Sequence, residues 1–298
     1  MEITHPDHKL IHSLGADARK DIIDWGIEAA HAPCVWDKTT GQGIKVAILD
    51  TGIDRDHPDL LPNLKAYADF TRSPYGPEDK QGHGTHVAGI IAAADNGEGV
   101  IGIAPNAELY AAKVLGDRGT GSFQAIIDGI RWAINLGVDV INMSLGCAAE
   151  PPQEMHEAIK DAAAAGIIIV AATGNENTGV GWPAMYDEVI AVSAMTPGKE
   201  RANFSNYGIK NEIMAPGVDI LSTYKDGGYA KLSGTSMATP IIAGCAALYL
   251  GFCKANGLPR PTLEELHAKL AVSCEDLATP GRDAYTGDGL IDLHKLIS

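Results

Sequence analysis

The sequence predicts an α/β fold in which a doubly wound, mostly parallel β-sheet carries helices on both of its faces. Short runs of consecutive apolar residues, each of strand length, alternate along the chain with longer segments of helical periodicity. Strands that are covered on both faces of a parallel sheet are apolar throughout, because neither face meets water. Regular alternation of such strands with helices is typical of layered α/β domains.

Four elements are expected in the first half of the chain. Continuous apolar runs predict buried strands, and apolar residues that recur three and four positions apart predict helices with one buried face. In order, these elements are a strand at residues 44–49, a helix at 86–94, a strand at 108–115 and a helix at 123–136. In the last of them, Ile126, Ile130 and Ala133 share one helical face.

The same alternation continues in the second half of the chain. The expected elements are a strand at residues 138–143, a helix at 154–165, strands at 167–172, 188–194 and 218–224, and a long helix at 236–256. Thr262 followed by Glu265 has the spacing of a capping box, in which each side chain bonds the backbone of the other residue. This pair predicts the start of a further helix.

The chain shows no linker rich in proline or serine that would divide this pattern. A single domain is therefore expected over residues 25–298. Residues 1–24 are polar and rich in histidine, without clear periodicity. They are expected to form an N-terminal extension and are a candidate short propeptide.

The formal net charge of −15 disfavours some classes of partner. The acidic residues are spread along the chain, which argues against binding to nucleic acid or to anionic membrane surfaces. The longest apolar run, residues 241–252, is shorter than the roughly 20 residues that span a bilayer. We therefore expect no membrane partner, and the oligomeric state, a homodimer included, remains open.

The cysteine content favours a reducing compartment. Five cysteines cannot all pair with one another, and none stands in a C-x-x-C spacing. Reduced thiols fit this usage best. The N-terminal residues also lack a basic start followed by an apolar stretch, which is the pattern of a secretory signal. We expect a cytoplasmic protein, unless export sequences have been removed.

Polar side chains follow three of the predicted strands: Asp50, Ser144 and Asn175. In parallel α/β sheets the active site lies beyond the carboxyl ends of the strands, so this edge is the expected site. His83 stands between glycines at a helix start, and Ser236 stands at the mouth of the long apolar helix. Alone, each residue could have a structural role, such as a loop cap, a buried histidine or a helix N-cap.

Together these residues predict nucleophilic catalysis. A serine hydroxyl is a weak nucleophile until an imidazole takes its proton, and a carboxylate fixes the tautomer of that imidazole. Ser236, His83 and Asp50 supply the three groups. The Asn175 amide and the backbone N–H of Ser236 at a helix N-terminus could stabilise the oxyanion that forms when a carbonyl is attacked.

Eight motifs resemble, in the same order, stretches of the subtilisin family of serine proteases (subtilases, peptidase family S8). They are VAILDTGID, HPDL, GHGTHVAG, GIAPNAELYAAKVL, DVINMSLG, AATGNEN, MAPGVDILSTY and LSGTSMATP. The resemblance covers the chain from Gly26 to its C-terminus. The short N-terminal extension is similar to that of the intracellular branch of the family.

This resemblance implies the subtilisin-like fold and a serine endopeptidase that hydrolyses peptide bonds of proteins through an acyl-enzyme on Ser236. By the same resemblance His83 is the general base and then the general acid, and Asp50 orients it. Asn175 stabilises the oxyanion. The implied partners are protein and peptide substrates.

The substrate is then expected to bind as an added strand between residues 119–121 and residues 144–146. The residues that the resemblance assigns to substrate binding are Gly119, Gly121, Ser144, Leu145, Gly146, Ala172, Thr173, Gly174, Gly181 and, in the S4 subsite, Phe123. Small residues around the S1 subsite favour a large apolar P1 side chain within a broad specificity. Glu176 at the rim could also admit a basic P1 residue. Core packing is the alternative role for Phe123.

A structural calcium ion is the cofactor that the resemblance implies. Its expected ligands are the side chains of Asp59, Asn96 and Asp21 and the backbone carbonyls of Ala94, Glu98 and Val100. Oxygen ligands of this mixed kind suit calcium better than a transition metal.

Other functions fit the motifs less well. His83 and His86 lack the glutamate and the four-residue spacing of the H-E-x-x-H zinc peptidases. Residues 116–122 resemble a phosphate-binding loop, but Ser122 stands where such a loop needs lysine. The sequence around Ser236 lacks the G-x-S-x-G motif of α/β-hydrolase esterases. A binding protein on an inactive protease scaffold is the alternative from another functional class.

Three features depart from the family pattern. Cys147 replaces an expected glycine, and residues 177–181 form a shorter loop than in many secreted relatives. At the N-terminus, Leu10-Ile11-His12-Ser13 keeps only the first two residues of a Leu-Ile-Pro-aromatic motif that the intracellular branch lays across its active site. We expect Leu10 and Ile11 to add as a strand to the substrate-binding edge and to act as a removable brake, a disordered tail being the alternative.

Overall fold

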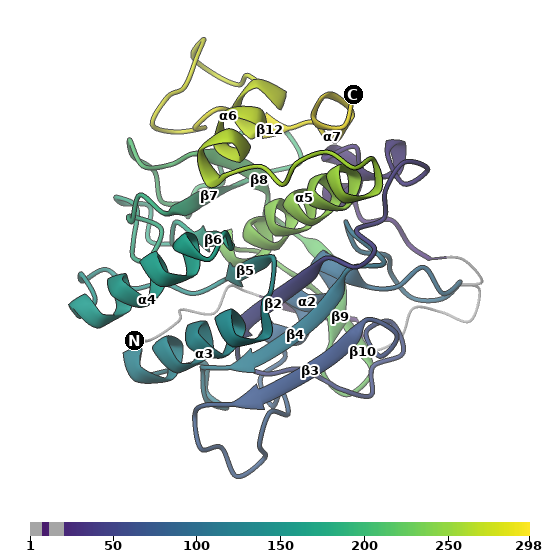
Figure 1. Ribbon diagram of the computed structural model, residues 1–298, viewed down its shortest axis with the longest axis vertical. Helices are drawn as coiled ribbons and strands as arrows, with labels where there is room; N and C mark the ends of the chain where they lie inside the picture. The colour runs from purple at the N-terminus through teal and green to yellow at the C-terminus, as the bar shows by residue number, and fades with distance from the viewer. Residues whose placement is uncertain (1–7, 12–20) are drawn as a thin grey trace.

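The computed structural model describes residues 8–11 and 21–298, and its centre is a nine-stranded β-sheet (Figure 1). The strand order is β11-β12-β8-β7-β6-β5-β2-β4-β3. The strands are β2 (Lys45–Asp50), β3 (Leu64–Asp69), β4 (Glu108–Lys113), β5 (Val140–Met143), β6 (Ile168–Ala172), β7 (Val189–Met195), β8 (Ile213–Pro216), β11 (Cys274–Glu275) and β12 (Leu290–Ile291). Neighbouring strands are parallel except β11 with β12, which confirms the mostly parallel sheet.

Helices cover both faces of this sheet. The longer ones are α2 (His83–Ala92), α3 (Phe123–Leu136), α4 (Gln153–Ala164), α5 (Thr235–Ala255) and α6 (Leu263–Ser273). α3 packs beside α4 over one core, whereas α2 and α5 share the core on the other face (Figure 1). Within β2, Val46 and Ile48 join one core, and Ala47 and Leu49 join the other. Because both faces are buried, the strand is apolar throughout.

Short helices flank this layered core near the two ends of the described chain. They are α1 (Trp25–Ala29), the 3₁₀ helix η1 (Ala32–Cys34) and α7 (Leu293–Leu296). The backbone N–H of Leu293 donates to the Ala30 carbonyl at 3.1 Å, which joins the start of α7 to the end of α1.

A second sheet is antiparallel and has the strand order β1 (His8–Ile11), β10 (Gly228–Leu232), β9 (Ile220–Tyr224). β1 pairs with the edge of β10, with His8 opposite Leu232 and Ile11 opposite Tyr229. An edge strand offers unpaired N–H and C=O groups, so it accepts another strand readily. Leu10 and Ile11 were expected to add as a strand to the substrate-binding edge. They do form a strand, but the strand that they pair with is β10 of the second sheet.

α5 is the described helix whose length and composition would also suit a membrane span. In this structure, however, 89% of its most apolar window is buried. It packs against α2 and against strands β5, β6, β7 and β8, so its apolar residues form the centre of the core (Figure 1).

The predicted elements are present, and their ends differ from the expectation by a few residues. The largest difference is at α2, which begins at His83 rather than at residue 86. Its N-cap residue, Gly82, has no side chain to cap the helix. The Asp79 carboxylate serves instead, because it accepts hydrogen bonds from the backbone N–H groups of Gly82 (2.7 Å) and Thr85 (2.9 Å). His83 is thereby fixed as the first residue of the helix.

Two further local features can be compared with the sequence. The capping box is confirmed, since the Thr262 hydroxyl accepts from the N–H of Glu265 (3.2 Å) and the Thr262 N–H donates to the Glu265 carboxylate (2.8 Å). β3 was not predicted, because it lies at the edge of the sheet and its positions are partly exposed rather than uniformly apolar.

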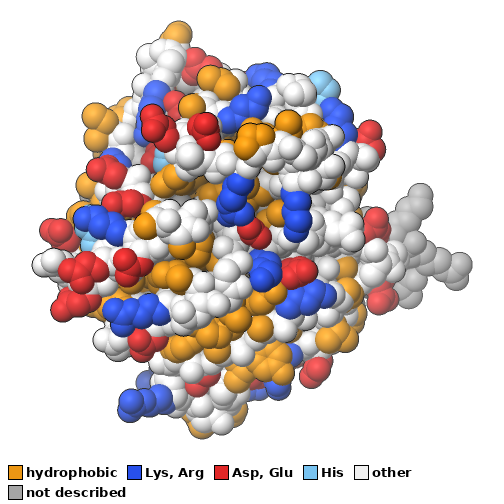
Figure 2. Space-filling model, viewed as in Figure 1, with side chains coloured by type: hydrophobic (Ala, Val, Ile, Leu, Met, Phe, Trp, Pro, Cys, Tyr) orange, Lys and Arg blue, Asp and Glu red, His pale blue; other side chains and the backbone are white. Residues whose placement is uncertain are grey.

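Charged side chains of both signs are interspersed over the face shown in Figure 2. The net charge of −15 is therefore not gathered into one acidic patch on this face. Such a mixed surface is typical of solvated charge.

Candidate active site

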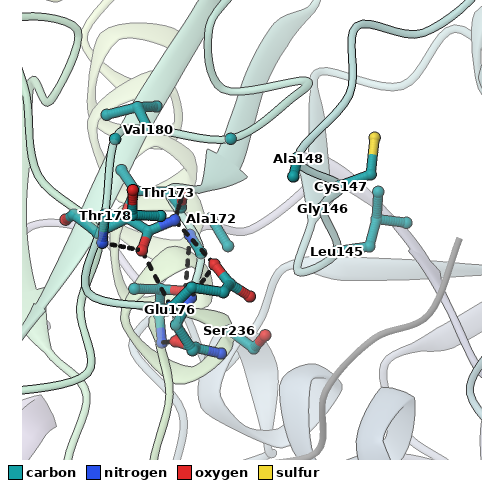
Figure 3. A pocket seen from close by; sticks show the side chains of 16 residues that line it. Leu145, Gly146, Cys147, Ala148, Ala172, Thr173, Glu176, Thr178, Val180 and Ser236 are labelled. Atoms are coloured by element: carbon teal, nitrogen blue, oxygen red, sulfur yellow. Dashed lines mark hydrogen bonds between the residues drawn. The ribbon is translucent and has the colours of Figure 1, made fainter.

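A cavity of about 520 Å³ opens where the segments after β5 and β6 meet the first turn of α5 (Figure 3). It is lined by residues 145–148, 172–176 and 178–181 together with Asn206, Thr235 and Ser236. The carboxyl ends of two parallel strands and a helix N-terminus thus converge, which is where an α/β sheet places its reactive groups.

Asp50 and His83 form a buried pair beside this edge. Asp50 ends β2, His83 begins α2, and their side chains are each about 1% exposed. The Nδ1 atom of His83 lies 2.7 Å from Oδ1 of Asp50, and the backbone N–H of Thr51 donates to the same oxygen at 2.7 Å. The carboxylate therefore fixes the ring so that Nδ1 carries the proton and Nε2 is the basic nitrogen.

The environment of His83 also sets its affinity for protons. Burial alone would lower the pKa of His83, since it disfavours the charged ring. The negative charge and hydrogen bond of Asp50, helped by Asp79, outweigh burial and raise the pKa of His83 above its ordinary value. The imidazole is thus a stronger base than a free histidine.

Ser236 is the second residue of α5, and it is tied to the segment after β5 by two reciprocal bonds. The Ser236 hydroxyl donates to the Ser144 carbonyl (3.2 Å), and the Ser144 hydroxyl donates to the Ser236 carbonyl (2.8 Å). Pro240 explains why that carbonyl is available, because proline lacks the N–H that would bond it one helical turn later. Ser236 and residues 144–146, a predicted substrate-binding segment, are therefore held beside each other.

The side chain of Asn175 is oriented by Thr235, the residue before Ser236. Its Oδ1 atom accepts hydrogen bonds from both the backbone N–H and the hydroxyl of Thr235, each at 2.9 Å. With the oxygen held in this way, the amide nitrogen is the group that can donate into the cavity. A carbonyl oxygen attacked by Ser236 would find this amide and the helix N-terminus as donors.

Most of the predicted substrate-binding residues line the cavity together with Ser236. They are Leu145, Gly146, Ala172, Thr173, Gly174 and Gly181. Gly121 lies instead in a separate hollow beside the start of α3, and Gly119 belongs to the turn that precedes it, where its N–H donates to the Gly116 carbonyl. Phe123 packs against the core under α3, as the packing alternative expects.

Two buried charged residues support the site, and sequence analysis missed both. Asp79 is 2% exposed and accepts a bond from the Thr51 hydroxyl (2.9 Å) in addition to capping α2. Lys113 ends β4 directly opposite Asp50, is fully buried, and donates to the Thr51 carbonyl. Its ammonium nitrogen also lies 3.1 Å from Oδ1 of Asp117. A lysine at the end of an otherwise apolar strand is a signal that could have revealed this contact.

Several carboxylate groups lie close to the loop at residues 94–100. Asp59 is buried, and burial raises the pKa of its carboxyl group. It accepts hydrogen bonds from the N–H of Val100 (3.0 Å) and the amide of Asn96 (3.2 Å), while Asp21 accepts from the N–H of Gly97 (3.1 Å). A hydrogen bond with Asp21 raises the pKa of Asp95. This crowding of negative groups fits a cation with oxygen ligands.

His86 is not part of a metal site. Its Nε2 atom lies 3.0 Å from the carbonyls of both Ile220 and Ala230, so this nitrogen carries the proton and joins α2 to β9 and β10. Burial lowers the pKa of His86 to about 3, which keeps the ring neutral. Within residues 8–11 and 21–298 no group of three or more His, Cys, Asp or Glu side chains is arranged to hold a metal.

The amino-acid sequence is similar to known proteins over most of its length. The model of the subtilase family matches residues 41–289. The chain is 47% identical to an intracellular serine protease of Paenibacillus polymyxa over 258 residues, which cover 83% of this chain and 79% of that protein. It is 48% identical over 228 residues, or 76% of its length, both to subtilisin Savinase of Lederbergia lenta and to an alkaline protease of Alkalihalobacillus alcalophilus. The match covers 83% of the former and 59% of the latter.

The His83–Asp50 pair leads to a prediction about protonation. In the intact protein, His83 should titrate above the ordinary histidine pKa of about 6.5. In Asp50→Asn the carboxylate charge is gone and burial remains, so the pKa should fall below that value. Proton and nitrogen NMR of the imidazole measures both. Asp226→Asn, a change at an exposed carboxylate, is the control and should leave the His83 titration unmoved. A pKa that is the same in the protein and in Asp50→Asn would contradict the role of the carboxylate.

Proposed function

The chain belongs to the subtilase family of serine proteases, and on that premise we propose that it is an endopeptidase that cleaves proteins through an acyl-enzyme on Ser236. The observation that carries the proposal is the arrangement around one cavity. Ser236 and Asn175 line it. His83, which is paired with the buried Asp50 at the end of β2, begins α2, and α2 packs beside α5, the helix of Ser236.

The proposed reaction begins with proton transfer. His83 takes the hydroxyl proton of Ser236 as the oxygen attacks the substrate carbonyl, and Asp50 stabilises the imidazolium that results. The negative oxygen of the tetrahedral intermediate is held by the Asn175 amide and the N–H of Ser236. His83 then gives the proton to the leaving amine, and a water molecule hydrolyses the acyl-enzyme with His83 again as base.

The bond between the Ser236 hydroxyl and the Ser144 carbonyl suggests how substrate binding starts this sequence. A hydroxyl has one proton to donate, so the proton that Ser236 gives to Ser144 is not available to His83. A substrate strand that pairs with residues 144–146 needs the Ser144 carbonyl as an acceptor. By taking that carbonyl, the substrate would release the nucleophile toward the base.

We propose a preference for large apolar P1 residues, and the composition of the cavity walls supports it. Leu145, Ala172 and Val180 contribute apolar surface (Figure 3), and the glycines Gly146 and Gly181 in the lining leave room. A long apolar side chain would be removed from water there, and the burial of each methylene group contributes about 0.8 kcal/mol.

We also propose that the protein acts in the cytoplasm. Cys34, Cys147, Cys245, Cys253 and Cys274 are all free thiols in the structure, which suits a reducing compartment. One of the relatives is named an intracellular serine protease, whereas others carry the names of alkaline proteases and subtilisins.

Replacement of the nucleophile tests the function. Ser236→Ala should fold normally and lose nearly all hydrolysis of a chromogenic tetrapeptide amide, because the group that forms the acyl-enzyme is gone. In subtilisin itself, loss of the nucleophile lowers kcat about 10⁶-fold. The thermal transition of the variant is the control for folding. More than a few per cent residual activity, free of contaminating protease, would instead favour a binding protein on an inactive scaffold.

We propose that the loop at residues 94–100 holds a structural calcium ion. Asp59, Asn96 and Asp21 would supply side-chain oxygens, and Ala94, Glu98 and Val100 would supply backbone carbonyls. Bound calcium would neutralise the carboxylates that otherwise crowd this loop. The support is the buried, polar-bonded Asp59 and the contact of Asp21 with the same loop.

Removal of calcium should therefore lower the melting temperature. A ligand that binds only the native state stabilises it by about 2.7 kcal/mol at a hundredfold excess over its Kd. Melting in EDTA and in millimolar calcium measures the difference. Asp59→Asn is the matched variant and should abolish the calcium dependence. Equal melting temperatures of the unmodified protein in the two solutions would count against the site.

We further propose that the N-terminal segment, about residues 1–20, restrains activity until it is removed. The support is the pairing of β1 with β10, since β10 ends at Leu232 and α5, with Ser236 in its first turn, begins at Thr235. A strand added there limits the movement of the chain that carries the nucleophile and occupies an edge next to it.

A chain that starts at Asp21 should then show higher initial peptidase activity than the full chain. The full chain should show a lag that shortens as enzyme concentration rises, because the segment is removed by proteolysis. Leu10→Pro, which deletes one backbone N–H from β1, should shorten the lag without truncation. Identical progress curves for the full and shortened chains would show that the segment does not inhibit.

A further inference from the structure

The side-chain amide of Asn206 bonds three residues of one loop in the cavity wall. Its nitrogen donates to the Thr173 carbonyl (3.0 Å) and to Oε2 of Glu176 (2.9 Å). Its oxygen accepts from the backbone N–H groups of Glu176 and Thr178, both at 3.0 Å. Asn206 is 1% exposed, and all four hydrogen-bonding positions of its side-chain amide are used.

Asn206 comes from a segment far along the chain from the loop that it holds. Its backbone N–H donates to the Gly174 carbonyl at 2.9 Å, so the whole residue is seated against the loop. Gly174 has a φ of +108°, and a Cβ atom there would lie 2.3 Å from the Asn206 amide nitrogen. The close approach therefore requires glycine at position 174 as well as asparagine at 206.

The same bonds fix the position of a charge. Glu176 is exposed at the rim of the cavity, where a free glutamate would move through several rotamers. Its Oε2 atom instead accepts from the Asn206 amide and from the N–H of Asn175 (3.0 Å). Among the described residues that line the cavity, Glu176 is the one with a charged side chain. Asn206 thus holds the one negative charge of the cavity wall at its mouth.

We propose that Asn206 is a positioning residue for P1 selectivity, which holds the Glu176 carboxylate where it can bind the cationic end of a P1 lysine or arginine. This inference rests on the proposed endopeptidase function. The apolar walls bind the methylene stem of such a side chain, and the fixed carboxylate binds its charged end. A carboxylate that is already held in place loses less conformational entropy when the P1 cation binds.

The test uses two peptide p-nitroanilides that share P2–P4 and carry lysine or phenylalanine at P1. The measured quantity is the ratio of kcat/KM for lysine to kcat/KM for phenylalanine. Glu176→Gln should lower this ratio about fivefold, as expected for a partly screened ion pair. Asn206→Ala should lower it by a similar factor, because the carboxylate is no longer held. Raising the salt concentration should lower the ratio of the unmodified protein and leave that of both variants nearly constant.

The double variant separates positioning from general support of the fold. If Asn206 acts through Glu176, then Asn206→Ala combined with Glu176→Gln should have the same ratio as Glu176→Gln alone. A further drop in the double variant, or equal losses on both substrates in Asn206→Ala, would overturn the proposal. If Asn206→Ala does not fold, Asn206→Ser replaces it with the same expectation.

Asn63 provides a matched control. It is also a buried asparagine, and its amide donates to the carbonyls of Ala92 (2.9 Å) and Pro105 (2.7 Å), away from the cavity. Asn63→Ala should lower the melting temperature and keep the lysine-to-phenylalanine ratio. A changed ratio in this variant would show that loss of any buried amide alters selectivity, which would also overturn the proposal. If the unmodified protein cleaves neither substrate, the endopeptidase function fails; if it cleaves both and Asn206→Ala keeps the ratio, only the role of Asn206 fails.

Discussion

The reactive edge is organised around one negative charge with almost no access to water, the carboxylate of Asp50. A buried carboxylate without partners would cost several kcal/mol, so the surrounding residues must supply donors. Thr51 and His83 donate directly to it. Lys113, the residue opposite Asp50 on the neighbouring strand, places its ammonium group between the Thr51 carbonyl and Asp117. The same arrangement makes His83 a stronger base than a free histidine. The hydrogen bond from His83 that stabilises the buried Asp50 carboxylate therefore also raises the pKa of His83, the base of the proposed reaction.

Bonds between side chains and backbone, rather than ion pairs, fasten the remaining parts of the site together. Because Pro240 has no N–H, the Ser236 carbonyl in the first turn of α5 accepts no bond from it. The Ser144 hydroxyl, in the segment after β5, donates to this carbonyl instead. Thr235 holds Asn175 from the same helical turn. Such bonds are short and directional, and they do not weaken when salt screens charges. They link the segments after β5 and β6 to one helix N-terminus, so that Asn175 and Ser236 are held in one bonded group.

The sequence predicted features that depend on neighbouring residues. It did not predict features that depend on a contact with a residue far along the chain. Continuous apolar runs predicted β2, β4, β5, β6, β7 and β9, but the short buried strands β8 and β12 were not predicted. Short motifs predicted Asp50 and the other polar groups at the sheet edge. β3 escaped because an edge strand is not uniformly apolar, and the start of α2 was misplaced because Asp79 replaces the usual N-cap. Asn206 escaped for a different reason. It bonds residues about thirty positions earlier, and nothing in its immediate neighbours marks it as part of the cavity wall.

The pKa of His86, three residues after His83 on the same helix, is shifted in the opposite direction. In the unfolded chain it would take up a proton below pH about 6.5, whereas in the folded chain burial holds its pKa at about 3. Between these two values the unfolded state binds one more proton than the native state at this position, so the contribution of His86 to stability is lost as the pH falls. Because the N–H of His86 joins α2 to the β9–β10 hairpin, which precedes Ser236, mild acid weakens the native state where that hairpin is attached. The native state is therefore less stable in acid because a buried imidazole must stay neutral to link α2 to β9 and β10.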